Sequence, residues 1–166
     1  SDLKDKLGPD VAAVYFENPA YLGTIETDAA EIGRLARDAG AETIVGVDPI
    51  SLGVLKAPGD YGADFVTGPV QSLGVHMQCG GGAGGFIASR DDPRYVHEYN
   101  GFLISIAETQ TPGQHGFGLA CPHQSSYGSR EHGKDWTGNS TYLWAIAGAV
   151  YMSLLGPEGF RELGHL

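Results

Sequence analysis

The chain has 166 residues, of which 42% are hydrophobic and 18% are charged, and 20 acidic residues against 10 basic ones give a formal net charge of −10. This length suits one domain, residues 1–166, that buries about 70% of its unfolded surface, and the negative charge argues against nucleic acid and membrane partners. Two cysteines are too few for a disulfide scaffold, and no apolar run reaches the ~18 residues of a membrane helix, so we expect a cytoplasmic protein.

Two apolar runs and one amphipathic segment predict a strand–helix–strand unit near the start of the chain. Residues 11–16 (VAAVYF) form a continuous apolar run, typical of a strand buried on both faces, and residues 43–47 (TIVGV) form a second run. Between them, apolar residues at helical spacing predict a helix that begins at Thr27 or Asp28 and runs to about Ala39. This order and length are typical of a right-handed βαβ unit with parallel strands.

Shorter elements are predicted in the middle of the chain. Residues 64–67 predict a third strand, residues 85–89 a fourth, and residues 91–99 a short helix. From 101 to 138 the periodicity fades, and a stretch this long without regular structure is usually functional or interfacial. The overall pattern predicts an α/β fold with a mostly parallel sheet and flanking helices.

The last part of the chain returns to a helical pattern. Residues 141–155 carry apolar residues on several faces, and Gly156-Pro157 is expected to end that helix before another begins at Glu158.

A glycine cluster in the middle of the chain matches a nucleotide-binding pattern only superficially. Residues 80–85 read GGGAGG, which satisfies G-x-G-x-x-G. A dinucleotide loop requires a strand before the glycines and a helix after them, whereas a strand-like segment follows here. Close approach of the backbone to the sheet or to a subunit interface is the favoured interpretation.

Four side chains could form a zinc site. His76 and Cys79 have the spacing H-x2-C, and Cys121 and His123 have the spacing C-x-H. Tetrahedral zinc takes such ligands, although the second spacing is tighter than usual and the two halves are far apart in the chain.

An aspartate at the end of a predicted strand suggests a cofactor site. Asp48 follows the second strand, where ligands of open α/β sheets bind. A pyridoxal phosphate site needs such a carboxylate, which keeps the pyridine nitrogen protonated, and a lysine one strand later to form the Schiff base. Asp64 stands 16 residues after Asp48, and the next strand is followed by Gln71 and Ser72. The spacing matches this half-site, but none of the four lysines of the chain follows the strand.

A long central segment carries a specific family resemblance. Residues 47–91 read VDPISLGVLKAPGDYGADFVTGPVQSLGVHMQCGGGAGGFIASRD, and the segments FENPAYLGTIE near the start and LLGPEGFRELG near the end belong to the same pattern. The chain resembles subunit 1 of two-subunit glycine decarboxylases, the P-proteins of the glycine cleavage system. The similarity is weakest between residues 101 and 136. It implies an internal fragment of the large domain of a fold-type I pyridoxal-phosphate-dependent transferase.

The resemblance also assigns candidate cofactor-binding positions. In the other subunit of the family, a His-Lys-Thr anchor follows a stretch like PGDMGAD. Laid over it, Gln71, Ser72 and Leu73 fall on the anchor, so Ser72 stands where the lysine would be. A serine hydroxyl cannot form an imine, which implies a subunit without a covalent cofactor and without catalytic residues of its own. Asp48 falls on the aspartate that faces the pyridine ring, and His76 is expected to line the same cleft.

What the resemblance implies for function is glycine dehydrogenase (decarboxylating), an oxidoreductase that works as a multi-subunit complex. The whole enzyme would decarboxylate glycine on pyridoxal phosphate and pass the aminomethyl group to the lipoyl arm of the H-protein. This chain, inactive by itself, would pair with the lysine-bearing subunit, which would hold the cofactor. Unpaired sheet edges also predict self-association.

Two other hypotheses remain open from the sequence. One is a non-catalytic scaffold or regulatory domain of the same fold, and the other is a metal-dependent enzyme that uses the His76, Cys79, Cys121 and His123 set. A partner lysine that restores activity would favour the glycine decarboxylase hypothesis over the scaffold, and stoichiometric zinc would favour the metal enzyme.

Overall fold

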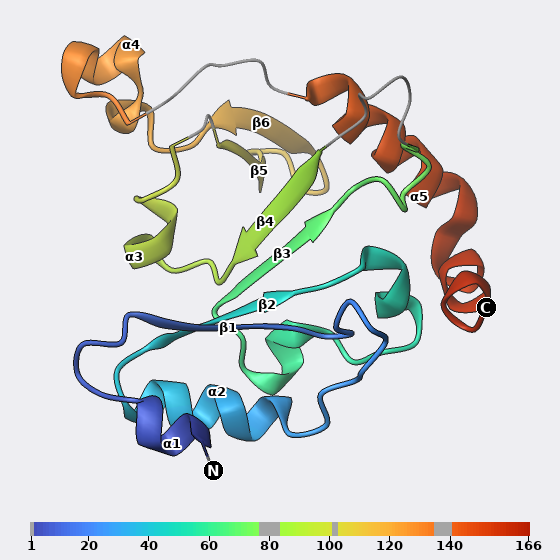
Figure 1. Ribbon diagram of the computed structural model, residues 1–166. Helices are drawn as coiled ribbons and strands as arrows, with labels where there is room; N and C mark the ends of the chain where they lie inside the picture. Colours follow the sequence, from blue (N-terminus) through green and yellow to red (C-terminus); the bar gives the residue numbers. More distant parts are fainter. Residues whose placement is uncertain (1, 77–83, 101–102, 135–140) are drawn as a thin grey trace. The chain divides into compact units, whose positions relative to one another are not determined.

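Figure 1 shows the computed structural model, which describes residues 2–76, 84–100, 103–134 and 141–166. The chain divides into two compact units. We call residues 1–90 together with 141–166 the sheet unit, and residues 91–140 the hairpin unit. The expectation of one domain over residues 1–166 stays a prediction.

Four strands form the sheet of the sheet unit, in the order β1-β2-β3-β4. Their bounds are Ala13–Glu17 for β1, Glu42–Gly46 for β2, Phe65–Pro69 for β3 and Gly85–Ser89 for β4. β2 runs parallel to both β1 and β3, and β4 is antiparallel to β3. The predicted α/β fold with a mostly parallel sheet is confirmed, and each strand predicted in this unit is present with nearly the predicted ends.

The two strands of the first pair differ in burial because β1 lies at the edge of the sheet. In β2, Thr43 and Val45 are buried. Along β1, exposed and half-buried residues alternate, and Tyr15 is 58% exposed. The prediction that residues 11–16 form a strand buried on both faces is therefore wrong. One face of β1 packs on the protein and the other, which carries Tyr15 and Glu17, does not.

The helix predicted between the first two strands is present as α2, Ala29–Asp38. Asp28 is its N-cap residue, and Gly40, at φ +80°, follows its last turn in the left-handed conformation that glycine adopts without strain. The buried residues Gly33 and Ala36 face the sheet, and α2 packs against β1 and β2. A shorter helix, α1, spans Asp2–Lys6.

The core of the sheet unit centres on three buried residues, Val45, Val47 and Ala63. Half-buried apolar side chains surround them, from β1, β3, β4 and the 3-10 helices η1 (Pro49–Gly53) and η2 (Pro58–Tyr61). The Asp64 carboxylate, 7% exposed, accepts a hydrogen bond from the Thr43 N–H (2.9 Å) and lies 3.4 Å from Arg90 Nε. Asp64 therefore ties the starts of β2 and β3 to the end of β4.

The last helix, α5, spans Tyr142–Gly164 but is interrupted at Gly156, which has non-helical angles (φ 62°, ψ −176°). The predicted end of the helix at Gly156-Pro157 is thus confirmed. The part after this break packs on η1 so closely that a Cβ on Gly53 would lie 2.1 Å from the Phe160 carbonyl oxygen. Among the described residues, no helix is both long and apolar enough to cross a membrane.

The hairpin unit contains regular structure that the sequence did not reveal. Strands β5 (Ile104–Glu108) and β6 (His115–Leu119) pair antiparallel, and short helices flank them. These helices are α3 (Pro93–Val96), η3 (Pro122–Gln124), α4 (Ser126–Ser129) and η4 (Arg130–His132). The prediction that residues 101–138 lack regular structure is therefore wrong for the described part. The glycines of β6 and the short strands weaken the period-2 pattern, which hides the hairpin.

Candidate functional site

A cleft of about 490 Å³ lies where the three parallel strands end, and we call it the strand-end cleft. Ligands of open α/β sheets bind at the carboxyl ends of parallel strands, so its position fits a binding site. β1 contributes Tyr15 and Glu17, and β2 contributes Gly46 and the two residues after it. The end of β3 contributes Thr67, Gly68 and Pro69, and the segments after β1 and β3 contribute Pro19, Ala20, Tyr21, Gln71 and Ser72.

Two of the sequence-predicted residues meet in this cleft. Asp48 is the N-cap of η1, and its Oδ1 accepts a hydrogen bond from the Ile50 N–H at 3.1 Å. The same oxygen accepts a second hydrogen bond from Ser72 Oγ at 2.9 Å. Ser72 thus connects the loop after β3 to the loop after β2, and the pair forms one wall of the cleft.

A tyrosine and a glutamate from β1 also line the cleft. The Tyr15 hydroxyl donates a hydrogen bond to Glu17 Oε1 at 3.2 Å. Partial burial of this hydroxyl and, secondarily, the neighbouring Glu17 carboxylate raise the pKa of Tyr15. The Tyr15 ring reaches over β2, where a Cβ on Gly46 would lie 2.6 Å from its hydroxyl oxygen. A side chain at position 46 would therefore displace this tyrosine from its place over β2.

The loop after β1 is held by one asparagine. Asn18 is buried, its Oδ1 accepts from the Glu26 N–H (3.1 Å), and its backbone N–H donates to the Gly46 carbonyl (2.9 Å). This arrangement fixes the residues that directly follow Asn18 in the cleft lining. Sequence reasoning missed the contribution of β1. The rule that selected Asp48, a polar residue at the end of a parallel strand, also selects Glu17.

A model of the family described as "Glycine cleavage system P-protein" matches residues 2–165 of this sequence. The chain belongs to the P-protein family of the glycine cleavage system. The resemblance inferred from the sequence motifs is confirmed.

Curated P-protein relatives are longer than this chain. The probable glycine dehydrogenase (decarboxylating) subunit 1 of Pyrococcus furiosus is 36% identical, over 99% of this chain and 36% of its own length. The protein of the same name from Staphylothermus marinus is 37% identical, over 99% of this chain and 35% of its own length. The chain therefore spans about a third of the curated relatives it matches.

One solved P-protein has the same fold over nearly the whole chain. It is glycine decarboxylase (P-protein) of the glycine cleavage system in an inhibitor-bound form, 39% identical, with a TM-score of 0.81. The match covers 95% of this chain and 35% of the solved one. The fold class expected from the sequence is confirmed by this match.

The strand-end cleft of this P-protein chain is lined by two charged side chains, the carboxylates of Glu17 and Asp48. No lysine or arginine stands among its lining residues in the described part of the chain. Such a lining accepts hydrogen bonds from donors and favours cationic groups. It offers neither an amine for imine formation nor a positive charge for a phosphate.

The remaining predicted positions lie elsewhere or outside the described residues. His76 is exposed and does not belong to the described lining of the strand-end cleft. Of the proposed zinc set, Cys79 lies outside the described residues, as does most of the 80–85 glycine cluster, and Cys121 and His123 belong to the hairpin unit. Within the described ranges, no three His, Cys, Asp or Glu side chains are grouped to hold a metal ion. No observation therefore favours the metal-enzyme hypothesis.

Proposed function

We propose that this chain is a segment of subunit 1 of glycine dehydrogenase (decarboxylating) and forms the side of the enzyme that does not bind the cofactor covalently. One observation carries the proposal: Ser72, which stands where the resemblance expects the lysine, donates a hydrogen bond to Asp48 within one wall of the strand-end cleft. The names of the relatives from Pyrococcus furiosus and Staphylothermus marinus support the same assignment.

The cleft does not fit pyridoxal phosphate as a resident group of this chain. Ser72 offers no amine, the described lining holds no basic side chain for the phosphate, and Oδ1 of Asp48 already accepts two hydrogen bonds. Only the Asp48 carboxylate matches what the pyridine nitrogen requires. We therefore assign the cofactor to the lysine of a homologous partner subunit, with this chain contributing structure and recognition.

In this proposal the assembled enzyme acts in the cytoplasm, decarboxylates glycine and passes the aminomethyl group to the lipoyl arm of an H-protein. Asp48 and Ser72 hold the shape of the cleft on this chain. His76, exposed four residues after Ser72, is proposed to face the partner or the carrier.

The test is an absorbance titration with pyridoxal phosphate, followed by borohydride reduction and peptide mass spectrometry. The chain alone is expected to form no specific imine. Addition of the lysine-bearing subunit is expected to give an imine on the partner's lysine. With a lipoylated H-protein present to accept the aminomethyl group, the mixture is expected to release labelled CO₂ from carboxyl-labelled glycine. A stoichiometric imine on Lys56 or Lys134 of the chain alone would show that Ser72 is misassigned. An imine on the partner without any effect of this chain on CO₂ release would favour the scaffold hypothesis.

A lysine introduced at position 72 tests the assignment of that position independently. Ser72→Lys is expected to gain a borohydride-trapped imine at residue 72. Ser51→Lys is the matched control. The Ser51 hydroxyl also donates a hydrogen bond to Asp48, to its backbone carbonyl oxygen (2.7 Å), but Ser51 does not belong to the described lining of the strand-end cleft. Equal trapping at both positions would mean that position 72 does not correspond to the anchoring lysine of the partner subunit.

A further inference from the structure

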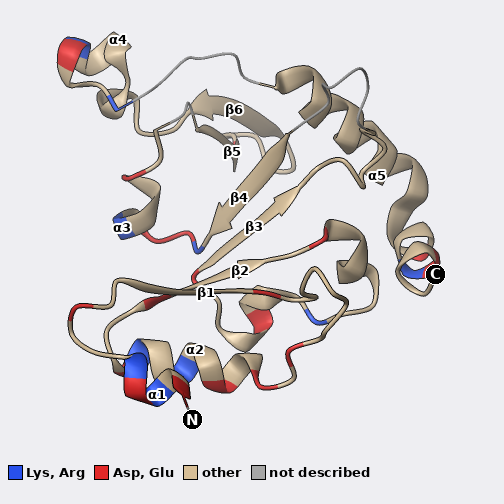
Figure 2. Cartoon of the chain, in the orientation of Figure 1, with Lys and Arg blue, Asp and Glu red and all other residues tan. Residues whose placement is uncertain are grey.

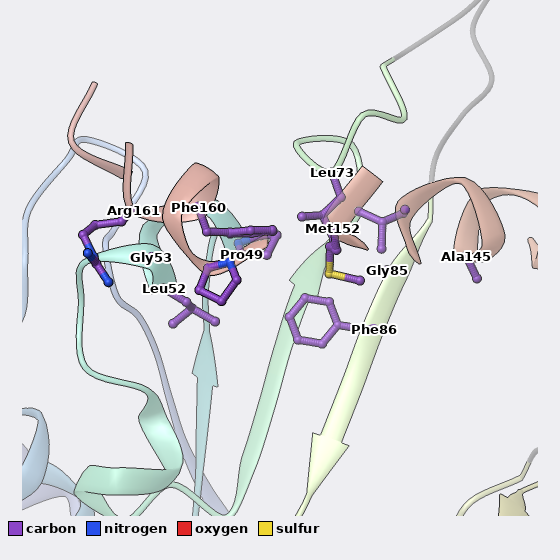
Figure 3. Close-up of a pocket in the computed structure, with 13 residues that line it drawn as sticks. Pro49, Leu52, Gly53, Leu73, Gly85, Phe86, Ala145, Met152, Phe160 and Arg161 are labelled. Carbon is purple, nitrogen blue, oxygen red and sulfur yellow. The ribbon is translucent and has the colours of Figure 1, made fainter. Parts of the chain in front are cut away.

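A second cavity of the sheet unit lies between α5, η1 and β4, and its lining is almost wholly apolar (Figure 3). We call this cavity of about 650 Å³ the apolar groove. Leu52, Leu73, Phe86, Met152 and Phe160 provide its large side chains. Arg161 stands at one end, where its guanidinium pairs with Glu158 at 2.9 Å. Because protein interiors are closely packed, we expect an apolar space of this size to be filled by an apolar group.

The helix α5, which lines one side of the groove, is apolar on more than one of its faces. Residues 142–157 contain no Asp, Glu, Lys or Arg, and Figure 2 shows charge on α1, α2 and the end of α5 but not on this part. One stripe packs on the loop after β3, where buried Gly148 lies near Leu73 and half-buried Tyr151 lies near Gly74. On another stripe, Leu143 is 68% exposed and Ile146 is 61% exposed. A helix that is apolar all round is typical of one covered by protein on several sides.

The size of the relatives indicates what covers it. This chain reproduces the fold of a solved P-protein with a TM-score of 0.81 yet accounts for only 35% of that chain. The rest of the subunit must pack on the part matched here, and it needs apolar surfaces on which to do so. The apolar groove and the uncharged part of α5 are such surfaces within the sheet unit.

We propose that the apolar groove is the seat of an uncharged, apolar segment from the other two-thirds of the P-protein subunit, whether joined to this chain or supplied as a separate polypeptide. This inference rests on family membership and on the groove, and not on the proposed activity.

The seated segment would also support the strand-end cleft. Pro49 and Leu73 line the apolar groove, and the residues directly before them, Asp48 and Ser72, form the hydrogen-bonded wall of the cleft. The same two loops therefore separate the two cavities. An apolar segment packed against Pro49 and Leu73 would hold both loops, and with them the Asp48–Ser72 pair.

The experiment uses the uncharged fluorescent probe N-phenyl-1-naphthylamine. This chain is expected to bind the probe saturably, at one equivalent. Ala145→Phe, which fills the groove from α5, is expected to weaken binding at least tenfold. Ala147→Phe, an exposed position on another face of the same helix and outside the groove lining, is the matched control and is expected to change nothing. Circular dichroism checks folding, and Ala145→Leu replaces Ala145→Phe if the larger side chain unfolds the unit.

The complete subunit 1 of Pyrococcus furiosus provides the deciding comparison. It is expected to show no saturable binding, because its own chain fills the groove. Equal binding by the complete subunit would overturn the proposal and make the groove a ligand site. A dimer of this chain in light scattering that excludes the probe would also overturn it, because a second copy would then be the occupant. Neither result depends on glycine turnover, so this inference can fail while the proposed function stands.

Discussion

The sheet unit and the hairpin unit are held together in different ways. In the sheet unit, β2 lies between two parallel neighbours and buries Thr43 and Val45 almost completely. In the hairpin unit, every residue of β5 is exposed, and among the described residues only Tyr95 and Ser125 are buried. Isolated two-stranded hairpins are marginally stable in water. Burial of side chains therefore stabilises the sheet unit, whereas the hairpin unit relies on hydrogen bonds between exposed groups, such as those of Gln124 and Lys134 with His97.

A charged residue introduced into a strand of each unit should give the largest difference in stability between the two units. Val45→Asp buries an unpaired carboxylate at a position that is 0% exposed, and we expect a loss of about 4 kcal/mol or more, enough to unfold the sheet unit. Ile106→Asp, at a strand position that is 63% exposed, should cost less than about 1 kcal/mol, since it loses mainly its cross-strand pair with Phe117. Urea unfolding followed by circular dichroism measures both. Similar losses would show that the hairpin unit is as tightly packed as the sheet unit.

Removal of an aspartate in each unit should give the next largest difference. Asp64→Ala leaves the Thr43 N–H without its side-chain partner and removes the ion pair with Arg90, so we expect a loss of roughly 2–3 kcal/mol. Asp92→Ala, the matched change, removes an exposed cap that accepts from the Arg94 N–H and should cost about 0.5–1 kcal/mol. Thermal unfolding of the two variants tests this order. The reverse order would contradict the role given to burial.

A methyl group at the strand-end cleft should have a smaller effect that depends on Tyr15. Gly46→Ala places a Cβ 2.6 Å from the Tyr15 hydroxyl, and the displacement is expected to cost about 1–2 kcal/mol. Tyr15→Phe removes that oxygen and should recover most of the loss in the double variant. A double-mutant cycle in urea measures the coupling between the two positions. Additive losses would mean that the ring of Tyr15 does not occupy the space above Gly46.

The smallest expected effect is the pH dependence that Tyr15 adds to the stability of the sheet unit. Its pKa is raised in the folded state above the ordinary value of a tyrosine, first by burial and then by Glu17. Folding therefore favours the neutral phenol. This contribution is complete below the unfolded pKa of about 10 and is lost as the pH rises through the folded pKa. Absorbance titration at the phenolate band should show a lower pKa for Tyr15 in Glu17→Gln. An unchanged Tyr15 pKa in that variant would show that the Glu17 carboxylate does not raise it.

The α/β class, the four strands of the sheet unit, α2 and the break at Gly156 were all predictable from the sequence. These features depend on local periodicity and on glycine and proline, which act over a few residues. The P-protein family was also evident from the motifs between residues 47 and 91. Asp48 could be selected because it directly follows a parallel strand.

Tertiary structure alone decided which side chains meet. Ser72 lies 24 residues after Asp48, and only the packing of β3 against β2 brings its hydroxyl to the carboxylate. The edge position of β1, which exposes Tyr15 and Glu17 to the strand-end cleft, follows from strand order and not from local pattern. The β5–β6 hairpin was missed because short, exposed strands with glycines give almost no periodic signal. Long-range contacts depend on the whole chain, so no local window of sequence contains them.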